Sequence, residues 1–195
     1  LFNHPPPSQG LASLIILGLF SRLNIAEAEG FDHIHGLVEA TKRAFTLRDA
    51  IITDPGLMTA DPRAYLDPAW LDAEADAIDP DHAANWLAKP AAGDTVWLGV
   101  TDGEGRAVSM IQSVFLKFGS GVVLPETGIL WQNRGAAFEL DPASPRMVGP
   151  NRLPFHTLNP AMADFPDGRR MVYGSMGGDG QPQFQAALFS RYAFF

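Results

Sequence analysis

The hydrophobic pattern in the first half of the chain is helical. Residues 10–23 are strongly apolar over the length of a helix. Over residues 31–48 the apolar side chains recur every three or four positions, which is typical of an amphipathic helix. Glu39 and Arg43 are spaced to pair across one turn of it.

Four Asp-Pro steps follow in the next segment. Asp is a favoured N-cap and Pro suits the first helical position, so each step is a helix-start signal. We therefore expect two short surface helices, over residues 68–78 and 80–88. The four steps are Asp54-Pro55, Asp61-Pro62, Asp67-Pro68 and Asp79-Pro80.

Residues 89–93 form a linker that contains Pro and Gly. After it, the spacing of the apolar residues changes from that of a helix to that of a strand. Residues 95–101 alternate, residues 102–105 form a turn signal and residues 107–114 return, which predicts a hairpin. Residues 182–195 have a helical pattern again. Further short strands are expected at residues 122–124, 128–132, 156–159 and 171–174. The pattern predicts an α+β fold, helical in its first half and built of antiparallel strands in its second.

Composition and charge exclude several classes of function. The chain has 195 residues, of which 46% are hydrophobic, enough for one domain-sized core. Its formal net charge is -8 and it has no run of Lys or Arg, which argues against a nucleic-acid partner. The absence of cysteine excludes disulfides, thiolate metal sites and a Cys nucleophile. No metal-ligand spacing is present, so we expect neither a metal nor another cofactor.

No targeting or membrane segment is evident in the sequence. The longest apolar run, residues 14–20, is too short to span a bilayer and lacks the flanks of a signal peptide. The chain begins at Leu1 without a Met and ends at Phe195 inside an apolar helical pattern. We therefore expect a piece of a longer protein, inactive by itself and with no membrane partner. Whether its compartment is cytoplasmic or periplasmic is left open.

Thr95 is a candidate nucleophile. A Thr that opens a strand after a linker is ordinarily structural, and its hydroxyl needs a neighbouring base to react. If the Asp94–Thr95 peptide bond were cut, the freed α-amino group of Thr95 would be that base. The linker before this bond and the strand after it suit such a cut.

The turn over residues 174–180 is a second candidate. Gly177 and Gly178 allow the backbone to approach a ligand closely, and a helix begins a few residues later. Backbone N–H groups at such a turn can stabilise an oxyanion. By itself a glycine-rich turn is most often only a tight turn.

Several motifs in collinear order resemble the γ-glutamyltransferase family. They are Pro5-Pro6-Pro7-Ser8, Glu39-Ala40-Thr41-Lys42-Arg43-Ala44-Phe45, Arg48-Asp49, Asp54-Pro55, Gly93-Asp94-Thr95, and the strings at residues 102–109, 118–123, 128–135, 154–160 and 174–180. The resemblance covers nearly the whole chain. It implies an N-terminal-nucleophile hydrolase with an αββα sandwich, incomplete here, made from a precursor that cleaves itself before a Thr.

The resemblance also implies a division of the chain and a set of roles. Residues 1–94 match the end of the large subunit, and residues 95–195 match the start of the small catalytic subunit. Thr95 matches the nucleophile, Ser113 a hydroxyl residue that assists it, and Gly177 and Gly178 the pair that forms the oxyanion hole. The implied reaction passes a γ-glutamyl group, as from glutathione-type amides, through an ester on Thr95 to water or an amino acid.

The residues that hold the glutamyl group in this family have changed. Phe115 stands for the family's Asn, Arg134 for its Gln, Ala137 for its Asp, and His156-Thr157 for its Ser-Ser pair. We expect Arg134, His156, Thr157 and Phe115 to line the substrate pocket, with Arg134 and His156 suited to an anionic acyl group. The alternative is that Arg134 forms a structural ion pair and His156 a hydrogen bond in the core.

Two further functions therefore stand beside γ-glutamyl transfer. One is an acylase for non-glutamyl amides, such as those with glutaryl side chains. The other is a binding homologue that has lost catalysis. The expected partners are a small amide substrate and the remainder of the large subunit.

Overall fold

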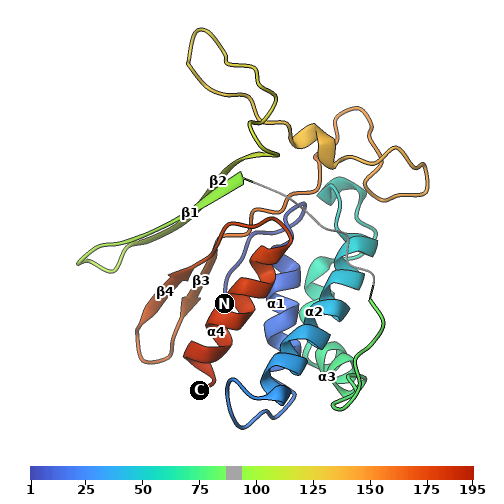
Figure 1. The fold of residues 1–195 in the computed structure, drawn as a ribbon, viewed down its shortest axis with the longest axis vertical. Coiled ribbons are helices and arrows are strands. Elements are labelled where there is room, and N and C mark those ends of the chain that lie inside the picture. The colour runs from blue at the N-terminus through green and yellow to red at the C-terminus, as the bar shows by residue number, and fades with distance from the viewer. Residues whose placement is uncertain (87–93) are drawn as a thin grey trace.

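A computed structural model describes residues 1–86 and 94–195. Its α-helices pack around α1, which is buried along most of its length and contacts each of the others (Figure 1). The apolar stretch that begins at residue 10 is thus the centre of the core. The α-helices are α1 (Gly10–Phe20), α2 (Phe31–Ile51), α3 (Pro68–Asp76) and α4 (Gly180–Ala193). Short 3-10 helices cover Pro55–Leu57, Pro62–Leu66 and Arg134–Ala137.

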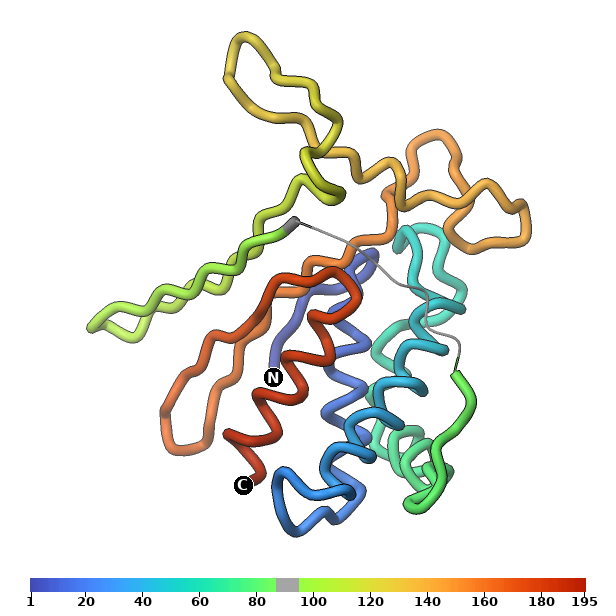
Figure 2. Tube along the Cα trace, viewed as in Figure 1, coloured from blue at the N-terminus to red at the C-terminus, as the bar shows by residue number. Residues whose placement is uncertain are grey.

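The described strands form two antiparallel hairpins. β1 (Asp94–Thr101) pairs with β2 (Ala107–Phe115), and β3 (Ala161–Asp164) pairs with β4 (Arg170–Tyr173). Figure 1 shows the β1–β2 hairpin extending away from the helices and the β3–β4 hairpin lying beside α4. The segment after β2 also projects from the body of the molecule, as the tube in Figure 2 shows.

Trp97 of β1 joins the two hairpins. Its indole Nε1–H donates to the Ser109 hydroxyl at 3.0 Å, and that hydroxyl lies 3.4 Å from the Tyr173 carbonyl oxygen, which accepts from it. A Cβ at Gly174 would lie 2.3 Å from the indole ring, so only glycine fits there. The face of the hairpin that carries Thr95 and Trp97 is therefore turned toward β4 and the turn that follows it.

The opposite face of the β1–β2 hairpin is apolar and open to solvent. Its exposed side chains are Val96, Leu98, Val100, Val108 and Met110. The strand alternation predicted from the sequence is therefore present, with one face turned inward and the other uncovered.

The N-terminal segment is extended and pairs with residues far away in sequence. Phe2 forms a bridge with Met162 of β3, and Ser8 forms a bridge with His156. The backbone N–H of Gln9 donates to the His156 carbonyl oxygen at 2.9 Å. The start of the chain thus lies beside the segment that leads into β3.

Some predicted elements differ in the structure. Residues 80–86 are not helical, because α2 side chains bind their backbone: Glu39 accepts the Ala84 N–H, and Lys42 donates to the Ala84 carbonyl. The strands expected at residues 122–124 and 128–132 reduce to one bridge between Val123 and Leu130, and residues 156–159 to the Ser8–His156 bridge. β3 was not predicted. The predicted linker at residues 89–93, and the end of the helix expected at 80–88, lie outside the described residues.

Candidate active site

Thr95 and Ser113 face each other across the start of the β1–β2 hairpin. They are register partners, and the Thr95 hydroxyl donates to the Ser113 hydroxyl at 3.0 Å. Both side chains are half-buried, on the inward face. Two hydroxyls that the sequence places eighteen residues apart are thus in hydrogen-bond contact.

The strand is irregular at this point. The register shifts between Asp94, which pairs with Phe115, and Thr95, which pairs with Ser113. Phe115 has φ 78, in the left-handed region that a bulky side chain rarely adopts. Its backbone N–H donates to the Ser113 hydroxyl at 2.9 Å, so the bulge itself orients Ser113. Strained backbone of this kind is concentrated at functional sites.

Arg134 is a buried cation beside this bulge. The residue is only 5% exposed, and its guanidinium lies 3.9 Å from the centre of the Phe115 ring. Its Nη1 donates to the Thr157 hydroxyl at 3.3 Å. Within the described part of the chain no carboxylate forms an ion pair with it.

Burial lowers the pKa of the Arg134 guanidinium to about 10, so it stays charged at neutral pH. A buried charge without a counter-charge is costly, and the cost falls when an anion binds. The three predicted pocket residues Arg134, Phe115 and Thr157 are therefore together, in an arrangement that suits a carboxylate.

His156 is neutral in this site. Burial, then the positive charge of Arg134 and that of His4, lower the pKa of its imidazole to about 4. Its Nδ1 accepts the Leu158 backbone N–H at 3.2 Å, which puts the proton of the neutral ring on Nε2. His156 lines a cavity of about 340 Å³ between the Pro-rich segment at residues 5–7 and Ile111 of β2.

Gly177 and Gly178 form the turn that leads into α4. Their φ angles are 111 and 55, both positive, which is a backbone conformation that glycine adopts without strain. The turn is closed by two backbone bonds, from the Gly180 N–H to the Gly177 carbonyl at 2.8 Å and from the Gln181 N–H to the Gly178 carbonyl at 3.2 Å. It follows β4 directly, three residues after the Gly174 that packs on Trp97.

Two residues that the sequence did not single out, Gln9 and Arg48, form hydrogen bonds next to the candidate residues. Gln9 is fully buried, and its Nε2 donates to the carbonyl oxygens of Thr157 and Gly178, each at 2.8 Å. Arg48 donates to the Gln9 Oε1 at 2.9 Å and to Asp179 Oδ1 at 3.0 Å. The available signal was a Gln directly before a buried helix, where Ser, Thr, Asn or Asp is the usual cap.

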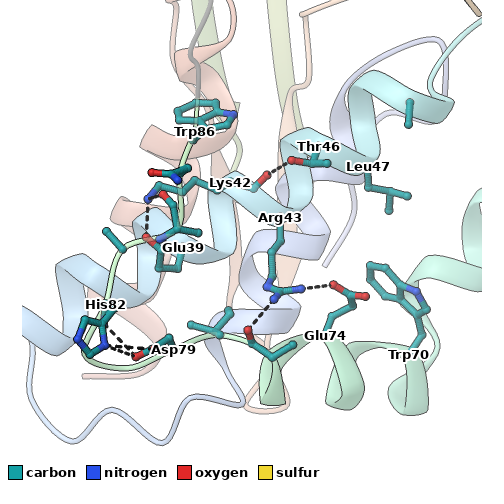
Figure 3. A pocket seen from close by; sticks show the side chains of 16 residues that line it. Glu39, Lys42, Arg43, Thr46, Leu47, Trp70, Glu74, Asp79, His82 and Trp86 are labelled. Carbon is teal, nitrogen blue, oxygen red and sulfur yellow. Dashed lines mark hydrogen bonds and ion pairs between the residues drawn. The ribbon is translucent and has the colours of Figure 1, made fainter.

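A separate groove of about 620 Å³ lies between α2 and the segment at residues 77–86. Figure 3 shows its charged side chains engaged with one another, Lys42 with Glu39 and Arg43 with Glu74, both at 2.6 Å. None of the predicted site residues lines it. Side chains of α2 that line it bond to the backbone of Ala77 and Ala84.

Two negative findings concern the described residues, 1–86 and 94–195. No helix among them is both long and apolar enough to cross a membrane. No three His, Asp or Glu side chains among them gather as a metal-binding group.

A family model described as gamma-glutamyltranspeptidase matches residues 1–195. The oxamate amidohydrolase proenzyme of Klebsiella pneumoniae is 59% identical over 192 residues, which cover 98% of this chain and 36% of that protein. The glutathione hydrolase-like YwrD proenzyme of Bacillus subtilis is 37% identical over 198 residues, 98% of this chain and 37% of that one.

A solved structure agrees with the fold. The cephalosporin acylase from Bacillus halodurans superposes with a TM-score of 0.85 at 31% identity, covering 98% of this chain and 35% of that chain. The α+β arrangement, with antiparallel strands in the second half, is thus that of an N-terminal-nucleophile hydrolase. The chain spans about a third of the length of each of these relatives.

Proposed function

The chain belongs to the γ-glutamyltranspeptidase family, and from that premise we propose that its protein is a self-processing amidohydrolase with Thr95 as nucleophile. Residues 1–94 would then end the large subunit, and residues 95–195 would begin the small one. The observation that carries the proposal is the 3.0 Å hydrogen bond between the Thr95 and Ser113 hydroxyls at a bulged strand start.

The proposed reaction is acyl transfer through an ester. Cleavage of the Asp94–Thr95 bond frees the α-amino group of Thr95, which then takes the proton of its own hydroxyl. The Thr95 Oγ1 attacks the amide carbonyl, the C–N bond breaks, and the leaving amine departs with that proton. Water then attacks the ester, releasing the acid and restoring the Thr95 hydroxyl.

The other predicted residues take supporting roles in this reaction. The Ser113 oxygen contacts the Thr95 oxygen and is itself held by the Phe115 N–H. It would thereby keep the Thr95 oxygen in place while the freed amine of Thr95 takes the hydroxyl proton. The backbone N–H groups of Gly177 and Gly178 would stabilise the negative oxygen of the tetrahedral intermediate. Donors of this type are set before the reaction begins, so they act without reorganisation.

The pocket favours a short amide that carries a carboxylate. Arg134 is buried and charged with no carboxylate partner in the described residues, and Thr157 and Phe115 hold it in place. A γ-glutamyl donor also carries an ammonium group, which Arg134 would repel and which Ala137 cannot pair. Oxamate has a carboxylate next to its amide and no ammonium, and a relative that is 59% identical is named an oxamate amidohydrolase. We therefore place oxamate-type amides before γ-glutamyl amides.

The first test is processing, followed by activity. The protein expressed from its complete coding sequence is examined by intact mass and N-terminal sequencing, for a subunit that begins at Thr95. Ammonia release is then measured with oxamate and with a neutral primary amide, and aniline release with a γ-glutamyl and a glutaryl anilide. We expect cleavage at Thr95, turnover of oxamate and loss of both in Thr95→Ala. A Thr95→Ala protein that keeps wild-type activity would overturn the nucleophile assignment and favour another site.

The same measurements decide between the remaining candidates. Preference for a γ-glutamyl or glutaryl anilide would keep the nucleophile but move the substrate class to that of the glutathione hydrolases or acylases. A folded, uncleaved protein that turns over none of these amides would favour a binding homologue.

A further inference from the structure

One buried carboxamide connects the two halves of the proposed site. The Gln9 Nε2 donates to the Thr157 carbonyl and to the Gly178 carbonyl, both at 2.8 Å. Thr157 also binds Arg134 through its hydroxyl, and Gly178 belongs to the glycine turn. Gln9 is therefore bonded at the same time to Thr157, the residue that contacts Arg134, and to the turn that leads into α4.

Arg48 decides which way this carboxamide points. An arginine has only N–H donors, so the Gln9 oxygen, not its nitrogen, must face the Arg48 Nη1 at 2.9 Å. Both N–H groups of the carboxamide are then left for the two carbonyls, and each is used. Arg48 is itself 6% exposed and also binds Asp179, the residue after Gly178.

Side chains from outside the glycine turn bond to it. Gly177 and Gly178 both have positive φ, and glycine has the least intrinsic restriction of its backbone. Two backbone bonds close the turn locally but attach it only to α4. In the described residues, the Gln9 side chain is what bonds the Gly178 carbonyl to the segment that holds Arg134.

We infer that Gln9 is a positioning residue. Its carboxamide sets the separation between the Arg134–Thr157 pair, which would bind the substrate carboxylate, and the Gly177–Gly178 turn. Arg48 fixes the orientation of that carboxamide. This inference rests on the proposed function. It means that one side chain bonds directly both to the segment that would hold the substrate carboxylate and to the turn that would hold the developing oxyanion. Such preorganisation matters most in the transition state, because small displacements there are costly.

The test compares Gln9→Met with Gln185→Met in the protein expressed from its complete coding sequence. Gln185 is another fully buried glutamine, but its carboxamide binds Asn159 and Ser13 and does not touch the turn. We expect Gln9→Met to lower kcat for oxamate about 10- to 100-fold, counted per subunit that begins at Thr95, with a smaller change in KM. Both variants are expected to lower the melting temperature by a similar amount, because each removes buried hydrogen bonds. Only Gln185→Met is expected to keep the wild-type kcat.

A second variant keeps the test open if Gln9→Met does not fold. In Gln9→Glu the side chain still accepts from Arg48, but as a carboxylate it has no proton for the carbonyls of Thr157 and Gly178. Protonation at low pH restores one donor. We therefore expect its activity, relative to wild type at the same pH, to rise as the pH falls.

The outcomes separate the inference from the proposed function. If Gln9→Met keeps wild-type kcat, or if Gln9→Glu shows no relative recovery at low pH, Gln9 only fills space and the inference is wrong. Inactivity of Thr95→Ala alongside either result leaves the proposed function standing. Wild-type activity in Thr95→Ala overturns the proposed function, and the inference with it.

Discussion

The Thr95 hydroxyl donates to the Ser113 hydroxyl at 3.0 Å from the directly opposite position on the neighbouring strand. Ser113 in turn accepts the Phe115 backbone N–H at 2.9 Å, across a bulge in which Phe115 has a positive φ. The orientation of the candidate nucleophile is thus tied to an irregular piece of backbone. The same Phe115 carries the Arg134 guanidinium on its ring. One residue therefore supports both the proposed nucleophile and the proposed carboxylate site.

Replacing Ser113 with Ala is expected to lower kcat/KM about 100-fold, because Thr95 loses the group that orients it. The matched control is Ser109→Ala, on the same face of β2, whose hydroxyl binds Trp97 and Tyr173. The control should lower the melting temperature and leave kcat/KM near wild type. Steady-state ammonia release and thermal denaturation measure both. Equal losses of kcat/KM in the two variants would mean that the hydroxyl acts only through packing.

Replacing Arg134 with Met is expected to lower kcat/KM for oxamate about 100-fold, equivalent to roughly 3 kcal/mol. The rate with a neutral amide should change little. Because the charge has no carboxylate partner in the described residues, its removal should leave the protein as stable as wild type or more so. Arg146→Met is the control, since Arg146 is also stacked on a ring, that of Phe155, but pairs with Asp49. A large loss of stability in Arg134→Met, with unchanged selectivity for charge, would indicate a structural role.

Replacing Gly177 with Ala should destabilise the protein by about 1–3 kcal/mol, because φ 111 is strained for any residue with a Cβ. The new Cβ would also lie 3.2 Å from the Phe184 ring. The kcat of the folded, cleaved variant should also fall, since the turn carries the proposed oxyanion donors. This loss is separate from the loss in the free energy of unfolding. Gly103→Ala is the control: its Cβ meets nothing within 4 Å and its φ is not positive. Urea denaturation together with kcat distinguishes the two effects, and a stable, fully active Gly177→Ala would refute this assignment.

His156 should make the stability of the protein depend on pH. Its pKa is about 4 in the folded protein against a usual 6.5, so between these values the unfolded chain binds a proton that the folded chain does not. The free energy of unfolding should therefore fall as the pH drops from 6.5 to 4, and this contribution should be fully present above 6.5. His156→Gln should flatten that part of the profile. His82→Gln, at an exposed surface position, should leave its shape unchanged, and a profile unaffected by His156→Gln would contradict the prediction.

The local patterns predicted most of the helices and the first hairpin well. The starts of α1, α2 and α3 are at the expected residues, because an apolar period and an Asp-Pro cap are local properties. The Asp67 side chain accepts the Ala69 N–H as the cap requires. Asp79 caps its turn in the same way, but residues 80–86 are not helical, because Glu39 and Lys42 of α2 bind the Ala84 backbone. Asp67 and Asp79 thus carry the same local signal for a helix start. Contacts with α2, far away in sequence, account for the different conformation after Asp79.

The sequence by itself determined the family, the helical first half, the hairpin at residues 95–114 and the short set of residues worth considering as a site. These follow from periodicity, turn chemistry and ordered motifs, which are all read within a few positions along the chain. Only the tertiary structure decided that Arg134 rests on Phe115 and Thr157, and that Gln9 joins Thr157 to Gly178. These contacts connect residues up to 169 positions apart, and no local pattern encodes them. A buried polar group must find its partners wherever the packed chain brings them, and that depends on the whole fold.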